Sequence, residues 1–252
     1  MWHSHPGPSE IIALVDFENA YNTLDRQAMI TTVCEEAPPF ARYAAFCYGA
    51  PTPLFGSGFC FMSEEGTEQG DVCGPLFFSK TLQRVLRKTC HDSPGLWSRA
   101  YLDDVTLCGK QERVLASLAD LCSESATIGL KASLSKCRLR GPELPETHPS
   151  GIPVVPWSAG LKILGTPVGS PKFVAEFVAD VSERLQDCLD RLSLLGDSFA
   201  SFHILRSCLS ACKVNHLLRS LPFEQGTPLA ASSKDQLVES LSSLVVSPLS
   251  PS

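Results

Sequence analysis

The chain lacks the features that mark a membrane-spanning or secreted protein. No apolar run reaches the length of about 20 residues that crosses a bilayer. The first eight residues contain neither a basic nor an apolar segment and do not form a secretion signal. The 11 cysteines include no Cys-x-x-Cys pair, which argues against a zinc site and favours reduced thiols. We therefore expect an intracellular protein, nuclear or cytoplasmic, with no membrane partner.

Basic side chains are scarce in the first part of the chain. Residues 1–70 carry 9 acidic and 2 basic residues, whereas residues 71–252 carry 18 acidic and 19 basic residues. The net charge of the whole chain is −6. An acidic balance is unusual for a protein that binds nucleic acid. Two basic clusters in the second part either face a phosphate backbone or form solvated surfaces. They are Arg84, Arg87 and Lys88, and Lys131, Lys136, Arg138 and Arg140.

The most informative segment is Tyr101-Leu102-Asp103-Asp104. It lies between two apolar runs, 97–102 and 105–108, and this pattern predicts a β-hairpin with two carboxylates at its turn. Adjacent carboxylates repel each other, so one tends to stay protonated unless a cation lies between them. Mg²⁺ meets that need because it prefers oxygen ligands. The alternative is a solvated acidic turn.

A third acid closes an apolar strand. The run Ile11 to Val15 is rich in β-branched residues and predicts a strand buried on both faces, which ends at Asp16. Asp16 could instead cap a helix, but Thr23 and Asp25 are better placed to cap the helix predicted from about 25 to 34. We therefore interpret Asp16 as a ligand for the same ions as the two hairpin aspartates. Carboxylates that hold two metal ions support in-line displacement at phosphorus, which is the chemistry of nucleotidyl transfer.

A glycine-rich segment, 65–75, lies between the first aspartate and the predicted hairpin. Gly66, Gly70 and Gly74 allow tight turns and the close approach of a ligand. Pro75 suits the first turn of a helix that we predict through Val85. Taken by itself, this segment is equally consistent with a plain loop-to-helix junction.

Together, and in this order, these segments resemble the palm of reverse transcriptases, most closely those of non-long-terminal-repeat retroelements. Five motifs carry the resemblance over about residues 11–169. They are Val15 to Asn22, Glu65 to Pro75, Tyr101 to Asp104, Gly129 to Cys137 and Leu161 to Gly165.

The sequence departs from the family pattern in three places. Val72 stands where the family usually has Pro, and Ser133 stands where it usually has Asn. The chain also begins only ten residues before the predicted strand, where the family's basic fingers normally precede it. We therefore expect the fingers to be largely missing, and the chain to be a fragment, with a degenerate element or a gene model cut short as the alternatives.

The resemblance implies catalytic and metal-binding roles for the acidic motifs. Asp16, Asp103 and Asp104, together with the backbone of Phe17, would hold two Mg²⁺ ions, for which Mn²⁺ can substitute. Lys136 would lie near the pyrophosphate as a general acid; the alternative is that it is a surface lysine.

Further residues would contact the substrates. By the same resemblance, Tyr21 would exclude a ribose 2′-hydroxyl. The other residues implied to bind nucleotide or template are Gln69, Gly70 and Tyr101. Leu164 and Gly165 would form the primer grip.

The implied fold is α+β: a polymerase palm, with a split βαβ antiparallel sheet and helices on one face, followed by an α-helical thumb-like region. The predicted element order of the palm is β-α-α-β-β-α-β. We expect an N-terminal tail at 1–10, the palm at 11–169, the thumb-like region at 170–222 and a disordered tail at 223–252. Apolar periodicity predicts helices at 112–128, 172–195 and 198–221, and five prolines within 141–160 predict a long loop.

The implied function is an RNA-directed DNA polymerase of a retroelement, with an RNA template, a DNA primer and deoxynucleoside triphosphates as partners. An RNA-directed RNA polymerase is an alternative, but that family usually has a second Asp at the position of Tyr21. A non-catalytic palm remnant that binds RNA or protein is an alternative of a different class. The missing fingers favour the remnant, whereas the three intact aspartates oppose it.

Overall fold

The computed structural model describes residues 9–68, 70–90, 95–145, 148–209, 214–221 and 235–236. By their contacts the described residues divide into a first unit, up to residue 156, and a second unit, from residue 157 onward. Gln69 and nearly all of the predicted tail lie outside the described residues. Within the part of the chain that is described, no helix is both long and apolar enough to cross a membrane.

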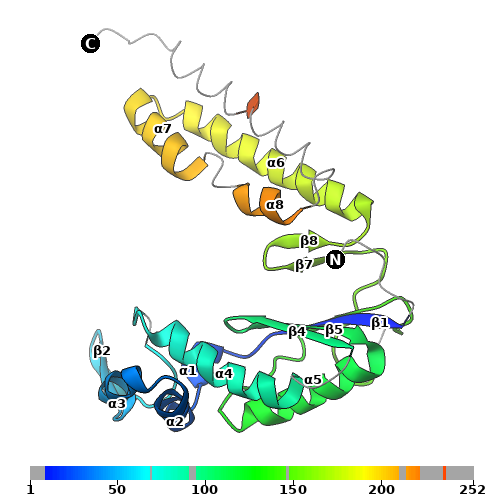
Figure 1. The fold of residues 1–252 in the computed structure, drawn as a ribbon. Helices are drawn as coiled ribbons and strands as arrows, with labels where there is room; N and C mark the ends of the chain where they lie inside the picture. Colours follow the sequence, from blue (N-terminus) through cyan, green and yellow to red (C-terminus); the bar gives the residue numbers. More distant parts are fainter. Residues whose placement is uncertain are drawn as a thin grey trace. The chain divides into compact units, whose positions relative to one another are not determined.

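Figure 1 gives the arrangement of helices and strands. The first unit contains β1 (Glu10–Val15), α1 (Ala20–Thr23), α2 (Arg26–Glu36), a 3₁₀ turn η1 (Pro38–Phe40), α3 (Ala41–Tyr48), β2 (Thr52–Gly56), β3 (Phe59–Ser63), α4 (Gly74–Cys90), β4 (Leu96–Tyr101), β5 (Asp104–Lys110), α5 (Gln111–Ala126) and β6 (Arg138–Arg140). The second unit contains β7 (Leu161–Ile163), β8 (Thr166–Val168), α6 (Pro171–Ser193), α7 (Ser198–Ile204), a π-helical segment η2 (Leu205–Leu209) and α8 (Asn215–Ser220).

The main sheet of the first unit is antiparallel, with the strand order β4-β5-β1-β6. Alternate residues of a strand point to opposite faces. Ile11, Ala13 and Val15 of β1, with Val105 and Leu107 of β5, therefore share one face, and all five belong to one buried core. The helices α4 and α5 contact this sheet and contribute to the same core. The prediction of a mixed fold with an antiparallel sheet and helices is confirmed.

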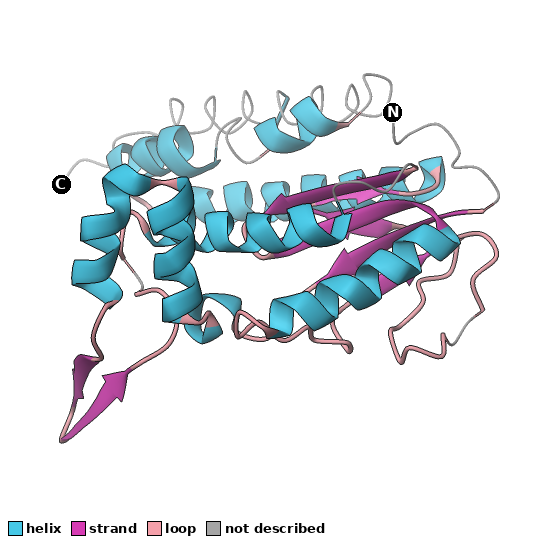
Figure 2. Cartoon of the chain, turned by 60° about the horizontal axis from the view of Figure 1, so that its bottom comes forward, coloured by secondary structure: helices cyan, strands magenta, loops and turns pink. Residues whose placement is uncertain are grey.

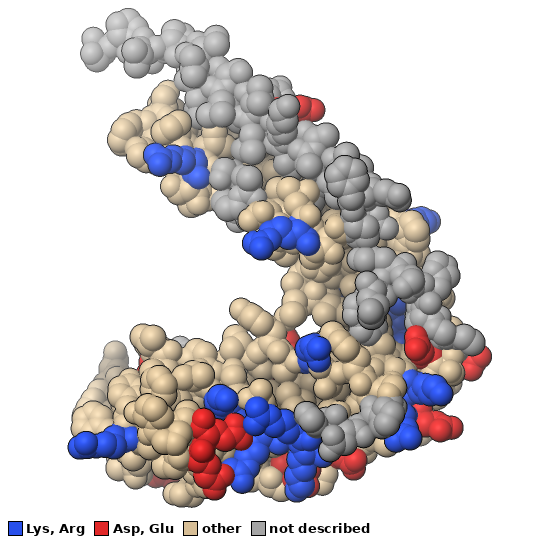
Figure 3. Space-filling view, viewed as in Figure 1, with Lys and Arg blue, Asp and Glu red and all other residues tan. Residues whose placement is uncertain are grey.

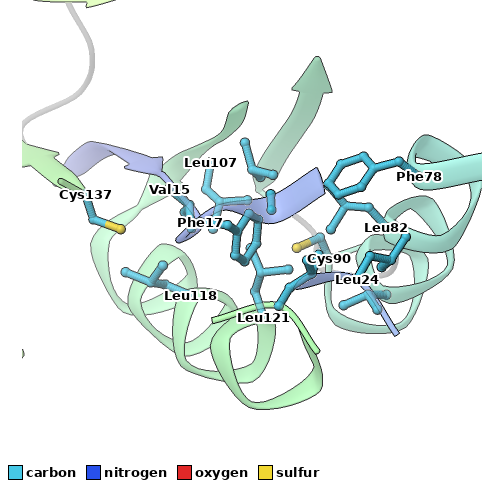
Figure 4. Packing of buried hydrophobic residues seen from close by; sticks show 14 of the residues in the cluster. Val15, Phe17, Leu24, Phe78, Leu82, Cys90, Leu107, Leu118, Leu121 and Cys137 are labelled. Carbon is cyan, nitrogen blue, oxygen red and sulfur yellow. The ribbon is translucent and has the colours of Figure 1, made fainter. Parts of the chain in front are cut away.

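The core of the first unit is formed by apolar side chains from distant parts of the chain. Figure 4 shows Phe17, which follows β1, close to Leu107 of β5 and Leu121 of α5. Phe78 of α4 belongs to the same cluster and is fully buried. Burial of each such side chain contributes about 1.5–3 kcal/mol, so the contacts of α4 and α5 hold the sheet in place.

Polar residues at the first turn fix where two of the helices begin. The side chain of Asp25 accepts a hydrogen bond from the backbone N–H of Ala28 at 2.6 Å, and α2 begins one residue later, as predicted. Ser170 accepts from the N–H of Phe173 at 3.2 Å, and Pro171 follows as the first residue of α6. These caps satisfy N–H groups that have no partner inside a helix.

The predicted element order omits the hairpin β2–β3, the helices α1 and α3, and the 3₁₀ turn η1. The helix α3 and the strands β2 and β3 lie between α2 and α4, and Figure 2 shows the hairpin β2–β3 extending away from the neighbouring helices. Almost all of its residues are exposed, including Phe55 at 81%. Because its strands are apolar on both faces, they lack the alternation that identifies a half-buried strand.

The helical predictions for the later parts of the chain are correct in position but not in every detail. The helices α5 and α6 match the predicted segments 112–128 and 172–195. The predicted helix over 198–221 is wrong as a single element, because the described residues contain α7, η2 and α8. The proposed domain boundary at residue 169 stays a prediction; by contacts, β7 and β8 belong with the helices that follow them.

Candidate active site

The three aspartates lie at one end of the main sheet because of how β1 pairs with β5. Val15 is opposite Val105, so the next residue, Asp16, leaves the strand beside Asp104. β4 and β5 pair up to Tyr101 and Asp104, which leaves Leu102 and Asp103 as the turn between them. The sequence prediction that these carboxylates belong together is therefore consistent with the strand register.

The turn between β4 and β5 has an unfavourable backbone conformation. Leu102 has a φ of 58°, in the left-handed region. Residues with a branched side chain seldom adopt this conformation, which costs about 1–2 kcal/mol. Strain of this size persists only where the surrounding structure enforces it. Here the paired strands on both sides of the turn enforce it.

The carboxylates are close enough to affect one another electrostatically. Partial burial raises the pKa of Asp104 above its ordinary value, and the negative charges of Asp103 and Asp16 raise it further. Three like charges at one place favour a bound cation. However, among the described residues no three His, Cys, Asp or Glu side chains are grouped closely enough to form a complete metal site as they stand.

The segment that contains Lys136 lies directly against the residues after β1. Phe17 forms an antiparallel bridge with Ala132, and the N–H of Ser133 donates to the carbonyl of Asp16 at 2.8 Å. As a result, Lys136 Nζ lies 3.9 Å from Asp16 Oδ1. Both side chains are substantially exposed, so this ion pair adds at most about 1 kcal/mol to stability. Its importance is that it brings an ammonium group to the aspartates.

Tyr21 of α1 also lies beside the aspartates. Its ring stacks on Phe78 of α4, with 4.4 Å between centroids and 20° between planes. Its hydroxyl is buried and has no hydrogen-bond partner among the described residues. Burial raises the pKa of Tyr21, and the charges of Asp103 and Tyr101 raise it further. The structure thus brings Tyr21, Tyr101 and Asp103 together.

The glycine-rich segment docks on the residues that follow Tyr21. The N–H of Gly66 donates to Leu24 O at 2.8 Å, and the N–H of Thr67 donates to Tyr21 O at 2.7 Å. Gly66 has a φ of 69°, and a Cβ there would lie 2.4 Å from Tyr21 O, so only glycine fits. Gly70 also has a positive φ, of 97°, but a Cβ added there would have no heavy atom within 4 Å among the described residues.

Two residues that sequence reasoning did not single out hold this segment in place. The carboxylate of Asp71 accepts hydrogen bonds from Tyr48 Oη at 2.5 Å, from Tyr43 Oη at 2.9 Å and from the N–H of Cys73 at 2.9 Å. Arg26 is buried and donates to Gly66 O at 2.9 Å. The partners lie 23–40 residues away except for Cys73, so only the local Asp71–Cys73 contact had a sequence signal, an Asp just before a helix.

The predicted primer-grip residues form the turn of the hairpin β7–β8. Leu164 has a φ of 47° and Gly165 a φ of 83°, as a two-residue hairpin turn requires. Leu164 is exposed, and the Cβ position of Gly165 is 3.1 Å from His216 Nε2. These residues belong to the second unit, so their position relative to the aspartates stays a prediction.

Sequence comparisons identify relatives of this chain. A family described as "Reverse transcriptase (RNA-dependent DNA polymerase)" matches residues 3–168. The "Retrotransposable element SLACS 132 kDa protein" of Trypanosoma brucei gambiense is 31% identical over 122 residues, which cover 46% of this chain and 10% of that protein. The chain therefore corresponds to a small part of this relative.

Structural comparisons find a similar fold in two telomerases. The apo telomerase of Candida tropicalis matches with a TM-score of 0.50 and 11% identity, over 95% of this chain and 48% of the telomerase. The telomerase of Candida albicans, solved with a TWJ fragment of telomeric RNA, matches with a TM-score of 0.51 and 10% identity, over 94% and 40%. At this level of identity the likeness concerns the fold, and the chain spans less than half of either protein.

Proposed function

Because the chain belongs to the reverse transcriptase (RNA-dependent DNA polymerase) family, and to its non-long-terminal-repeat retroelement type, we propose that it extends a DNA primer on an RNA template by two-metal nucleotidyl transfer. The observation that carries this proposal is the convergence of Asp16 with Asp103 and Asp104 at one end of the sheet. The substrates are deoxynucleoside triphosphates.

The donor set at this end of the sheet fits Mg²⁺ or Mn²⁺. Asp16, Asp103 and Asp104, with the backbone carbonyl of Phe17, would hold two ions. The pKa of Asp104 is raised first by partial burial and then by the negative charges of Asp103 and Asp16, which such ions would compensate. Since these side chains do not yet form a closed group, cation binding would draw them together. When bound, the ions lower the pKa of the primer hydroxyl and neutralise charge on the leaving pyrophosphate.

The neighbouring residues orient and select the substrates. The ring of Tyr21 is held by its stacking on Phe78, which supports a role in excluding a ribose 2′-hydroxyl. Lys136 Nζ lies 3.9 Å from Asp16 Oδ1, which supports a role for Lys136 as the proton donor to the pyrophosphate. Gly70 and Tyr101, with Gln69, would line the nascent base pair, and Leu164 with Gly165 would support the primer.

The test is primer extension on an RNA template with Mg²⁺ or Mn²⁺ and deoxynucleotides. We expect the wild-type chain to extend the primer, and the variant Asp103→Asn/Asp104→Asn to lose at least about 100-fold in rate, roughly the contribution of several kcal/mol from metal ligation. The matched control is Asp120→Asn on α5, an exposed carboxylate outside the site, which should extend normally.

Three outcomes would contradict this proposal in different ways. Normal extension by the double variant would mean that the aspartates are not the metal ligands. Absence of extension by the folded wild-type chain would favour a non-catalytic remnant that binds RNA or protein. A preference for ribonucleotides would favour an RNA-directed RNA polymerase.

A further inference from the structure

A cavity of about 380 Å³ lies in the first unit between α4 and β4. One of its ends is formed by Leu76 and Leu102, and Leu102 directly precedes Asp103. We call this cavity the α4–β4 groove. Because its lining includes the turn that carries two of the proposed metal ligands, a molecule in the groove would adjoin the catalytic turn.

The groove is elongated. Its lining on α4 extends from Leu76 to Arg87, which corresponds to about 16 Å of helix. Its lining on β4 and the following turn extends from Ser98 to Leu102, about 13 Å of strand. The helix α4 and the strand β4 run antiparallel to each other. The groove between them therefore extends from the catalytic turn toward the other end of α4. At a rise of about 3.4 Å per nucleotide in a duplex strand, several phosphates would pass along it.

The polar lining of the groove is positively charged. Lys80, Arg87 and Arg99 contribute three cations. Lys80 and Arg87 share a single acid, Glu36, at 3.8 Å and 3.2 Å. Within the described part of the chain, Arg99 has no acidic partner. Its guanidinium donates to the carbonyl of Ser98 at 2.7 Å and lies 5.1 Å from the centre of the Trp97 ring.

The remaining cations of α4 differ from those of the groove. Arg84 pairs with Glu35, and Lys88 pairs with Glu124 at 2.6 Å. Each of them therefore has its own acid, and neither lines the groove. Figure 3 shows the resulting mixture of Lys, Arg, Asp and Glu side chains on the first unit. The unmatched positive charge on α4 and β4 is concentrated in the groove.

We propose that the α4–β4 groove binds the phosphate backbone of one strand of the template–primer duplex as that duplex leaves the catalytic turn. This inference rests on the proposed polymerase function. The ion pairs with Glu36 are partly exposed to solvent, and such pairs contribute little. A phosphate can therefore replace the carboxylate, and the release of counterions from the nucleic acid favours this exchange. Arg99 supplies guanidinium N–H groups suited to phosphate oxygens.

The inference is tested by the salt dependence of binding to a fluorescent RNA–DNA hybrid with a recessed primer end. For Arg99→Gln we expect affinity to fall about two- to fivefold. The magnitude of the log–log salt slope should decrease by ~0.9 for each phosphate that the variant no longer neutralises. Lys80→Gln should act in the same direction. The matched control is Arg113→Gln, which removes an exposed arginine of α5 outside the groove and should leave affinity and slope unchanged.

Arg99 is an exposed residue of β4, so we expect its substitution to leave the fold intact. Circular dichroism of the variant checks this before binding is measured. Wild-type affinity and slope in a folded Arg99→Gln variant would overturn the inference, as would the absence of binding by the wild-type chain. If primer extension depends on Asp103 and Asp104 while Arg99→Gln binds normally, the groove fails and the polymerase proposal stands. If binding depends on Arg99 but no primer is extended, the proposed role of the groove stands and the polymerase proposal fails.

Discussion

The carboxylate of Asp71 connects α3 to the start of α4, and Asp71→Asn removes its charge while keeping its shape. The wild-type carboxylate accepts hydrogen bonds from Tyr48 and from the N–H of Cys73, at 2.5 Å and 2.9 Å. An asparagine side chain retains one acceptor oxygen. Its NH₂ group is a hydrogen-bond donor, and it would face whichever of the two donors, Tyr48 or the N–H of Cys73, the oxygen does not reach. Hydrogen bonds to charged groups contribute about 1.5–3 kcal/mol each. We expect the variant to be less stable by about 2 kcal/mol, or about 4–8 °C in Tm for a unit of this size.

This loss should depend on pH in a defined direction. Burial acts to raise the pKa of Asp71, but the hydrogen bonds from Tyr48, Cys73 and Tyr43 lower it below its ordinary value. A carboxyl group with a lowered pKa in the folded state stabilises the protein above its unfolded pKa of about 3.9. That stabilisation is lost as the pH falls through the folded value. The difference between wild type and variant should therefore stay constant from neutral pH to about pH 5 and shrink below about pH 4.

The assay is thermal and urea unfolding followed by circular dichroism across this pH range. The matched control is Asp120→Asn, which removes an exposed carboxylate from α5 and should change stability by less than about 0.5 kcal/mol. A variant as stable as wild type at neutral pH, or a difference that grows on acidification, would refute the view that hydrogen bonds to the ionised carboxylate hold this junction.

Substitutions at Gly66 and Tyr21 test the packing around Tyr21 and its role in substrate selection, each with a control variant. Gly66→Ala should destabilise the chain by about 3 kcal/mol or more in urea unfolding, because the residue is left-handed and the added Cβ would lie 2.4 Å from Tyr21 O. Gly58→Ala is the control: Gly58 is also left-handed but an added Cβ meets no neighbour, so this variant should lose only about 1–2 kcal/mol. Equal losses in the two variants would exclude the clash with Tyr21 O. In primer extension, Tyr21→Ala should increase incorporation of ribonucleotides relative to deoxynucleotides. Tyr21→Phe should retain the wild-type selectivity, because the hydroxyl of Tyr21 that it removes has no hydrogen-bond partner among the described residues. Unchanged selectivity in the alanine variant would show that Tyr21 does not select the substrate.

Local signals in the sequence account for the elements that surround the site. The apolar run before Asp16 forms β1, the apolar runs around Asp103 form β4 and β5, and Asp25 caps α2. Each of these signals involves residues within a few positions of one another. The resemblance to reverse transcriptases is confirmed by the family match over residues 3–168.

Other features depend on contacts that no short segment contains. The buried Arg26 bonds to Ser63 and Gly66, which lie 37 and 40 residues away. The hairpin β2–β3 was missed because its apolar residues do not alternate with polar ones. The predicted segment 198–221 has helical periodicity, but its described part changes from α-helical to π-helical geometry at Leu205. Periodicity identifies a helical tendency, whereas tertiary packing decides where a helix is interrupted.

The candidate site depends on the register between β1 and β5. The pattern of apolar residues in these two strands restricts that register. Asp16 and Asp104 share the face of the sheet opposite Ala13, Val15 and Val105, which belong to the core. A slip of one residue between β1 and β5 would turn the side chains of β1 to the other face and direct Asp16 toward the core. An unpaired buried carboxylate is costly, so the same apolar residues that stabilise the core also select the register that brings the aspartates together. The arrangement of the three aspartates is therefore specified in part by buried residues of the core.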